Sequence, residues 1–178
     1  MDIVTVKDKQ FSLSISAQRI QERVAEVAAQ ISQDLEGKNP LFLAVLNGSF
    51  MYAADLVRNI TTPCEVAFVR FSSYEGMEST GKVKEVMGLT DNIEGRTVVV
   101  VEDIIDSGLT MQQLLGNLRE KNPAEIRVAS LLVKPDNLEV ELDIAYTCFN
   151  IPNDFIVGYG LDYDGFGRNL PAIYTVMG

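Results

Sequence analysis

The chain has 178 residues, 47% of them hydrophobic and 22% charged, a composition typical of one globular domain over residues 1–178 and not of a disordered or fibrous protein. Its net charge of −10 opposes nonspecific attraction to nucleic acid or to anionic lipid, so we expect neither a nucleic-acid nor a membrane partner. Histidine is absent, which excludes Ser-His, Cys-His and histidine-zinc mechanisms.

The N-terminal part of the chain is expected to contain one long helix and one buried strand. The first residues alternate between apolar and polar side chains and do not form the basic and apolar regions of a secretion signal, so we expect a cytoplasmic protein. Ser16 then precedes apolar residues at helical spacing and Gly37 follows them, which predicts an amphipathic helix between the two. Residues 41–46 are apolar without alternation, as in a strand covered on both faces, and a short helix follows through Leu56.

Strands and helices continue to alternate along the rest of the chain. The expected elements are a strand at 65–71, a mobile loop at 72–82, an extended segment at 83–89, a strand at 97–101, a helix at 110–122, a strand at 126–133, and short extended pieces at 144–148 and 155–159. Parallel strands need crossover connections, which are usually helices, so this order predicts an α/β fold with a central, mainly parallel sheet flanked by helices.

The turn between the strand at 97–101 and the next helix has the properties of a phosphate site. In open α/β sheets ligands bind at the carboxyl ends of the strands, and a helix N-terminus offers free N–H groups to a phosphate. Gly108 lets the backbone approach a ligand closely, and Ser107 and Thr110 add hydroxyl donors. A phosphate ester would therefore fit between the strand and the helix.

Three carboxylates accompany this turn and need a purpose, because they would repel a phosphate. Glu102 and Asp103 could accept hydrogen bonds from vicinal sugar hydroxyls, either directly or through Mg²⁺. Asp106 could exchange a proton with a reacting heterocycle. The alternative is an acidic surface turn that caps the helix through Asp106 or Ser107.

The segment VVVVEDIIDSGLT at 98–110 resembles the signature of the type I phosphoribosyltransferases. The chain is also similar to the hypoxanthine-guanine branch of that family almost from end to end. The further similar segments are LNGSFMYAADL at 46–56, FSSYEGMESTG at 71–81, LLVK at 131–134 and IPNDFIVGYGLDYDGFGRNLP at 151–171. The resemblance implies a core of about 17–134 with a small hood built from 1–16 and 135–178.

The resemblance also implies a reaction: Mg²⁺-dependent transfer of the phosphoribosyl group from phosphoribosyl pyrophosphate to a 6-oxopurine, with release of pyrophosphate. By this resemblance Glu102 and Asp103 hold the ribose hydroxyls and contact the metal, and Asp106 faces the purine N7. The 5′-phosphate would be held by the four residues that follow, Ser107, Gly108, Leu109 and Thr110.

The resemblance assigns the base to residues near the C-terminus. Lys134 would donate to the 6-oxo group, whereas an adenine site would need an acceptor there, so this residue selects 6-oxopurines. Phe155 would stack on the base and Ile156 would contact its edge through the backbone, while Asp162 would contact the metal. Without the resemblance, Phe155 would be interpreted as ordinary core packing and Lys134 as a solvated surface lysine.

Pyrophosphate and loop closure involve two further segments. Asn47 and Gly48 correspond to the pyrophosphate loop, in which many relatives carry a lysine at the position of Asn47. Without that charge, pyrophosphate would be held by backbone N–H groups, Mg²⁺ and Arg168. Ser73 and Tyr74 correspond to a mobile loop that closes over the reacting carbon and excludes water.

Two alternatives remain open from the sequence. One is a relative that uses another base, such as xanthine or adenine, and the other is a non-catalytic, RNA-binding regulator from the same fold family. The acidic composition and the absence of a basic patch disfavour the RNA-binding alternative. The resemblance further implies a homodimer or a homotetramer.

Overall fold

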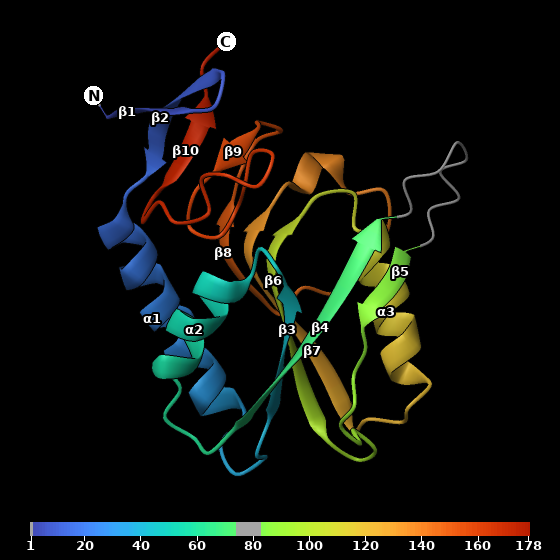
Figure 1. The fold of residues 1–178 in the computed structure, drawn as a ribbon. Coiled ribbons are helices and arrows are strands. Elements are labelled where there is room, and N and C mark those ends of the chain that lie inside the picture. The colour runs from blue at the N-terminus through green and yellow to red at the C-terminus, as the bar shows by residue number, and fades with distance from the viewer. Residues whose placement is uncertain (1, 74–82) are drawn as a thin grey trace.

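The computed structural model describes residues 2–73 and 83–178, which form two sheets (Figure 1). The larger sheet contains, in spatial order, β5 (Val83–Met87), β4 (Glu65–Ser73), β3 (Leu41–Leu46), β6 (Thr97–Ile105), β7 (Glu125–Val133) and β8 (Tyr146–Asn150). Its neighbouring strands are parallel except for β4 and β5, so the predicted α/β class with a mainly parallel sheet is confirmed.

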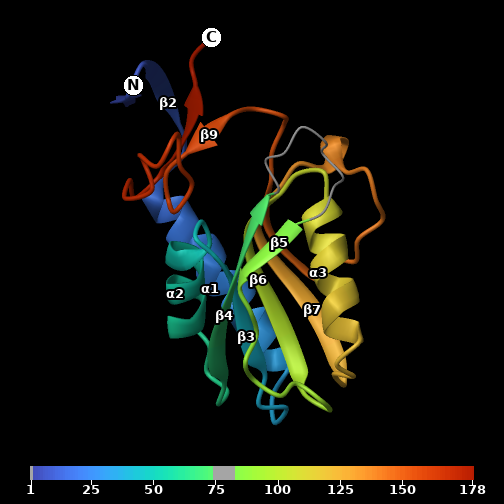
Figure 2. The ribbon, with the colours of Figure 1, turned by 45° about the vertical axis from the view of Figure 1, so that its right-hand side comes forward.

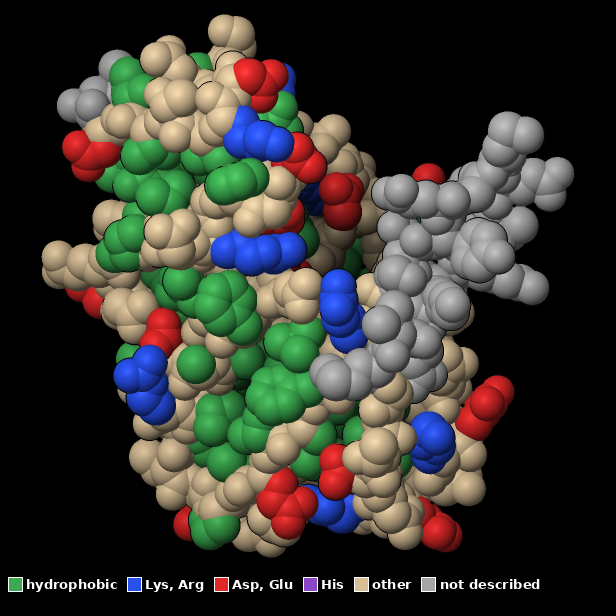
Figure 3. All heavy atoms as spheres, viewed as in Figure 1, with side chains coloured by type: hydrophobic (Ala, Val, Ile, Leu, Met, Phe, Trp, Pro, Cys, Tyr) green, Lys and Arg blue, Asp and Glu red, His purple; other side chains and the backbone are tan. Residues whose placement is uncertain are grey.

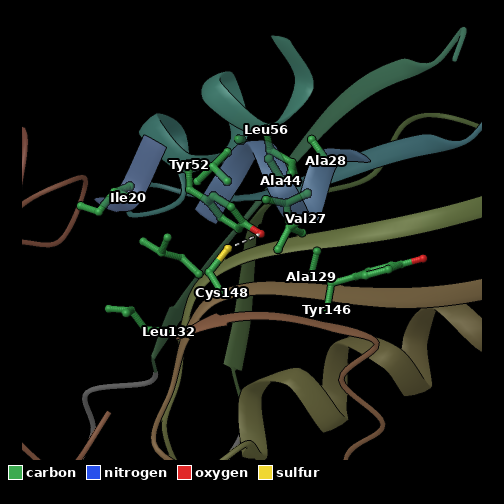
Figure 4. Close-up of a cluster of buried hydrophobic side chains, with 14 of the residues drawn as sticks. Ile20, Val27, Ala28, Ala44, Tyr52, Leu56, Ala129, Leu132, Tyr146 and Cys148 are labelled. Carbon is green, nitrogen blue, oxygen red and sulfur yellow. Dashed lines mark hydrogen bonds between the residues drawn. The ribbon is translucent and has the colours of Figure 1, made fainter. Parts of the chain in front are cut away.

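Helices cover both faces of the larger sheet, with α1 (Ala17–Asp34) and α2 (Phe50–Arg58) on one face and α3 (Leu109–Arg119) on the other (Figure 2). A strand that is covered by helices on both faces needs apolar side chains on both faces, and β3 is an example. Its Phe42 and Ala44 pack with α1 and α2, and Leu43 packs on the opposite side with α3. Figure 4 shows the α1 and α2 side, where side chains from helices and strands fill one buried cluster. No helix in the described ranges is long and apolar enough to cross a membrane.

The two ends of the chain meet in the smaller sheet, which is the expected hood (Figure 1). It is antiparallel, with the order β1 (Ile3–Val6), β2 (Lys9–Ile15), β10 (Ile173–Val176) and β9 (Ile156–Val157). The hood boundary differs from the one expected at residue 135, because β8 pairs with β7 in the larger sheet. Tyr146 and Cys148 of β8 are buried against α1, and that burial draws the strand into the core.

The strand before the signature turn is longer than predicted. β6 runs to Ile105 instead of ending at residue 101, because β7 continues beside it and pairs with it as far as Ile105↔Val133. Helix α3 correspondingly begins at Leu109, after the left-handed Gly108, whose φ is 86°. The acids at 102 and 103 therefore lie in a strand rather than in a turn.

The remaining differences concern short elements and the loop at 72–82. β8 lies two residues later than the extended piece expected at 144–148, and β9 covers only two of the residues expected at 155–159. Ser73 ends β4, whereas Tyr74 and the rest of the loop expected to be mobile lie outside the described residues.

Candidate active site

The candidate site lies where the order of the parallel strands changes direction. After β3 the chain adds β4 on one side of β3, and it later adds β6 on the other side. Such a switch point leaves a crevice outside the carboxyl ends of the two diverging strands, where open α/β sheets bind ligands. The loop of residues 47–49 follows β3 at this point, and residues 102–108 form the end of β6 and the turn after it.

Strand β6 loses one neighbour at the point where its acids begin. Its pairing with β3 ends at Ala44↔Val101, whereas its pairing with β7 continues to the end of the strand. Glu102 and Asp103 therefore lie on the side of the crevice, and their carboxylates lie close enough to each other to interact. Each carboxylate also accepts a local backbone hydrogen bond, Glu102 from the N–H of Asp103 and Asp103 from the N–H of Ile104.

The carboxylate of Asp103 lies directly against the loop after β3. A Cβ placed on Gly48 would lie 1.9 Å from Asp103 Oδ2, so only glycine allows the loop to approach this acid. The peptide bond between Leu46 and Asn47 is cis, and the buried hydroxyl of Ser49 donates to the carbonyl of Val45. Asp103 and the loop at 47–49 thus form one packed unit.

Burial raises the pKa of Glu102 well above its usual range, and the neighbouring Asp103 carboxylate raises it further. Both causes disfavour a second negative charge beside Asp103. A bound cation, or a group that donates hydrogen bonds, would stabilise the ionised form of Glu102. This pair of acids is therefore suited to bind either one.

The turn after β6 forms a cradle at the N-terminus of α3. Ser107 Oγ accepts a hydrogen bond from the N–H of Leu109, and the carbonyl of Ser107 accepts one from the N–H of Glu139. A hollow of about 130 Å³ is lined by residues of the segment from Glu102 to Met111, among them Thr110. The first N–H groups of a helix have no partner within it, so this hollow suits an anion of phosphate size.

Lys134 and Asp106 lie together at the carboxyl ends of the neighbouring strands β7 and β6. The Lys134 Nζ is 3.4 Å from Asp106 Oδ2 and 3.5 Å from the amide oxygen of Asn153. Lys134 is only 8% exposed, so it is not the solvated surface lysine of the alternative interpretation. Asp106 remains half exposed, and its other oxygen accepts a 2.8 Å hydrogen bond from Asn137.

Phe155 directly precedes strand β9 of the hood. Its side chain is 44% exposed, although two aromatic rings lie beside it. Its ring centroid is 6.0 Å from that of the buried Phe11 and 5.6 Å from that of Tyr163, with Tyr163 edge-on. Ordinary core packing would bury this ring. The next residue, Ile156, is buried in the α1 and α2 cluster and so ties the hood to the core.

Arg168 reaches the loop after β3 through a turn of the hood. Its Nη1 donates to the carbonyl of Gly160 at 2.7 Å, and its Nη2 lies 3.4 Å from Asp162. A Cβ on Gly160 would lie 2.2 Å from the carbonyl oxygen of Gly48, so this turn rests directly on the loop. Asp162 also accepts a hydrogen bond from the N–H of Gly165.

The site residues expected from the sequence thus fall into connected groups around one crevice. One group joins the acids of β6 to the loop after β3, a second joins Asp106 to Lys134, and a third joins Arg168 and Asp162 to the same loop through Gly160. In the described part of the chain, no three Asp, Glu or Cys side chains gather closely enough to hold a metal ion on their own.

Two residues of the site, Asn137 and Asn153, were missed from the sequence. Pro135 begins a short 3₁₀ helix (Pro135–Asn137) that turns the chain back toward Asp106. The Lys-Pro pair at the end of a strand was the available signal for such a turn. Asn153 lies in the irregular segment before Phe155, and the sequence carries no comparable signal for its contact with Lys134.

Larger hollows occur elsewhere but do not have this chemistry. One of about 490 Å³ lies between the end of α3 and the beginning of β7, and one of about 650 Å³ lies beside the end of α1. The hollow beside β7 opens at the amino end of a parallel strand, away from the switch point. The smaller hollow at the end of β6, together with the loop after β3 that packs against Asp103, is therefore the candidate active site.

Comparisons with known proteins find relatives over most of the chain. Residues 14–164 match the family described as the phosphoribosyl transferase domain. The chain is 43% identical over 160 residues to a hypoxanthine-guanine phosphoribosyltransferase of Streptococcus pneumoniae, covering 89% of each chain. It is 42% identical over 172 residues to that of Mycobacterium tuberculosis, covering 93% of this chain and 85% of the relative. A crystal structure of a hypoxanthine-guanine phosphoribosyltransferase from Bacillus anthracis superposes with a TM-score of 0.88 at 43% identity, covering 94% of this chain and 97% of that one.

Proposed function

The chain belongs to the phosphoribosyltransferase family, on its hypoxanthine-guanine branch, and from this membership we propose that it transfers the 5-phosphoribosyl group of phosphoribosyl pyrophosphate to hypoxanthine or guanine. The products are the purine nucleoside monophosphate and pyrophosphate, as required for purine salvage. Residues of both sheets would serve one reaction, so we treat 1–178 as a single catalytic domain.

One observation supports this proposal most strongly: Lys134 and Asp106 lie 3.4 Å apart beside the anion cradle at the start of α3. A 6-oxopurine presents an acceptor at its 6-oxo group and further nitrogens along the same side of the ring. A lysine donor and a carboxylate at adjacent strand ends could meet those two kinds of atom. An adenine amino group would instead face the ammonium donor to donor.

The reaction breaks the bond between C1′ of the ribose and the pyrophosphate oxygen and forms a bond from C1′ to one imidazole nitrogen of the purine, while the proton on the N7 side of that ring leaves. Asp106 would accept a hydrogen bond from the purine N7 side and stabilise the base as that proton leaves. The partly exposed ring of Phe155 would carry the base by stacking. The backbone of Ile156 would contact the edge of the base.

The phosphate and sugar would be held on the β6 side of the crevice. The N–H groups and hydroxyls of the segment from Ser107 to Thr110 would bind the 5′-phosphate at the N-terminus of α3. Glu102 and Asp103 would accept from the ribose hydroxyls. Burial and, after it, the Asp103 carboxylate raise the pKa of Glu102, and a hydrogen bond donated by a sugar hydroxyl would oppose both.

We further propose that Mg²⁺ is the cofactor. Mg²⁺ is usually held by one or two carboxylates together with waters and substrate phosphates, and Glu102 and Asp103 are an oxygen-only pair of this kind. When bound, the ion would neutralise the charge of the leaving pyrophosphate. Asp162 would join it only by exchanging one of its present contacts with Gly165 or Arg168.

Pyrophosphate would be held on the β3 side, by the backbone around Asn47 and Gly48 and by the guanidinium of Arg168. Arg168 supports this assignment because its contact with Gly160 brings it to the turn that rests on Gly48. Ser73 and Tyr74 would act in loop closure, which remains a prediction from the sequence.

A purine panel tests the proposed function. With phosphoribosyl pyrophosphate and Mg²⁺, we expect nucleotide formation from hypoxanthine and guanine with kcat/KM at least about 100-fold above that for adenine, the size of effect that an unmatched buried polar group produces. We expect Lys134→Ala to raise KM for hypoxanthine and to reduce this preference. Faster turnover of adenine would contradict the assignment of Lys134.

We also propose that the chain forms a homo-oligomer, a dimer or a tetramer, through the face around α2 and β4. Phe50 of α2 and Val66 and Phe68 of β4 are exposed by 42%, 42% and 47%. Figure 3 shows hydrophobic side chains gathered over this part of the molecule. Apolar surface of this kind is typical of an interaction site. Most soluble oligomers are built from identical chains, so we propose a second copy of this chain as the partner.

A further inference from the structure

A turn of the hood, residues 158–161, has an unusual residue at its centre. Gly158 and Leu161 exchange two backbone hydrogen bonds of 3.0 Å, and the two residues between them both have positive φ, 48° for Tyr159 and 101° for Gly160. Such a turn is ordinarily built from Gly, Asn or Asp, and a bulky side chain at positive φ is an outlier. The side chain of Tyr159 must therefore contribute something that offsets this strained backbone.

Tyr159 connects this turn to helix α2. Its side chain is buried, and its hydroxyl donates to the Oδ2 atom of Asp55, which also accepts a 3.1 Å hydrogen bond from Gln21. The other oxygen of Asp55 accepts from Arg58 at 2.9 Å. Burial, followed by the Asp55 carboxylate, raises the pKa of the Tyr159 hydroxyl, so the group remains a donor throughout the neutral range.

The residue after Tyr159 carries this connection to the loop after β3. Gly160 lies so close to the carbonyl of Gly48 that no side chain fits between them, and it makes two hydrogen bonds with Arg168. Helix α2, which holds Asp55, begins directly after the same loop, at Phe50. The Tyr159–Asp55 hydrogen bond thus links the helix that follows the loop to the turn that rests on it.

We infer that Tyr159 and Asp55 are positioning residues for the pyrophosphate half of the site, which they hold by fixing the Gly158–Leu161 turn against the loop at 47–49 and Arg168. This inference rests on the proposed function, since that function assigns pyrophosphate to the loop. Asn47 gives the loop no charged side chain, so binding depends on where its backbone N–H groups and Arg168 are placed. A hydrogen bond that fixes this placement then acts on pyrophosphate affinity and leaves the base side unaffected.

The test is Tyr159→Phe in the full chain, which keeps the ring and removes only the hydroxyl. We expect KM for phosphoribosyl pyrophosphate, and KM for pyrophosphate in the reverse reaction, to rise about tenfold, as expected when a hydrogen bond to a charged group is lost. KM for hypoxanthine should stay within about twofold of the wild-type value. A purely structural role would lower the amount of active enzyme and change no KM.

Tyr146→Phe is the matched control. Tyr146 also donates to an aspartate of a helix, Asp34 at 2.7 Å, but it lies on β8 away from the crevice. Its loss should cost comparable stability and leave every KM unchanged. Should Tyr159→Phe fail to fold, Asp55→Asn carries the same test, because it weakens the same hydrogen bond from the helix side.

The outcomes separate this inference from the proposed function. If the wild-type chain forms no nucleotide from hypoxanthine, the proposed function fails. If the wild-type chain is active and folded Tyr159→Phe or Asp55→Asn shows unchanged KM for both donor and pyrophosphate, or equal changes for donor and base, the positioning role is overturned and the proposed function stands.

Discussion

The two residues proposed to face the base, Lys134 and Asp106, contact each other. The ammonium of Lys134 is buried beside Asp106 and Asn153, and Asp106 is also held by Asn137. A buried charge needs partners of this kind, because an unpaired one would be costly. A 6-oxopurine would replace part of these contacts with its own acceptor and donor atoms. The two side chains would therefore already lie at adjacent strand ends before the base binds.

We expect Asp106→Asn to reduce turnover much more than it reduces donor affinity. Asparagine retains the acceptor for Asn137 but loses the charge that stabilises the base as its proton leaves. We predict a fall in kcat of about 10²-fold or more, the lower end for loss of a positioned acid or base, and a KM for phosphoribosyl pyrophosphate within about twofold. Steady-state kinetics at saturating hypoxanthine measures both, with the exposed Asp136→Asn as control. Equal losses in kcat and donor affinity would contradict the proton role.

The acid pair of β6 should make ligand-free stability depend on pH. The pKa of Glu102 is raised in the folded state, so the folded protein holds this proton more tightly than the unfolded chain. The resulting stability is fully present below the unfolded-state pKa of about 4.3 and is lost as pH rises through the folded-state value.

Glu102→Gln should abolish this loss, because glutamine does not ionise. Urea unfolding of the ligand-free protein from pH 4 to pH 8 would then give a smaller decline for Glu102→Gln than for wild type, whereas the exposed Glu141→Gln should follow wild type. Parallel declines in wild type and Glu102→Gln would show that burial of this carboxylate has no such effect. The same variant should weaken Mg²⁺-supported donor binding.

At the scale of elements, the site is formed by strands that end at different points. β6 extends four residues beyond its last pairing with β3, and this offset exposes its acids to the loop that leaves β3. The loop can reach them only because two glycines permit close approach, Gly48 toward Asp103 and Gly160 toward Gly48 itself. Three chain segments distant in sequence are thereby packed together, with the backbone of Gly48 against the side chain of Asp103 and the backbone of Gly160 against the backbone of Gly48.

Gly48→Ala tests this close packing. The new Cβ would lie 1.9 Å from Asp103 Oδ2, so either the acid or the loop must move. A displacement of about 1 Å in a positioning element can cost about 10²-fold in rate, and we expect a loss of that size in kcat/KM for phosphoribosyl pyrophosphate.

Gly116→Ala is the matched control for this prediction. It lies within α3, and a Cβ there would have nothing within 4 Å. It should stabilise the protein by about 0.5–1 kcal/mol without changing activity, since alanine is favoured over glycine inside a helix. If Gly48→Ala were as active as Gly116→Ala, the loop would not need this contact.

Much of the larger sheet could be predicted from the sequence, because strands covered on both faces are unbroken apolar runs and the helices between them have regular apolar spacing. The end of β6 could not, since residues 102–105 become a strand only through pairing with β7. The hood strands carry weak local signals because β2 pairs with β10 from the other end of the chain. For the same reason, the contacts of Lys134 with Asn153 and of Tyr159 with Asp55 depend on tertiary packing alone.

In the whole molecule, the hood and the core would each contribute residues to the proposed site. The core would supply the acids, the anion cradle and Lys134, and the hood would supply Phe155 and Arg168. Ile156 and Tyr159 are buried in the core cluster although they belong to hood segments, so the two parts are joined beside the crevice.

The proposed oligomer predicts the mass that the chain should show in solution. Phe68→Glu places a charge on the exposed apolar face of β4, where it should not disturb the fold but should disfavour burial against a second copy. Light scattering after gel filtration should show a multiple of the 19.6 kDa chain mass for wild type and a smaller species for Phe68→Glu. A wild-type chain that runs as a monomer would contradict the proposal.

A crystal structure with inosine or guanosine monophosphate and Mg²⁺ would test the assignment of the phosphate, the base and Lys134 together. We predict the 5′-phosphate at the residues from Ser107 to Thr110, the base stacked on Phe155, and the 6-oxo group within hydrogen-bonding distance of Lys134 Nζ. A nucleotide bound in one of the larger hollows away from the crevice, or a base whose 6-oxo group lies away from Lys134, would contradict it.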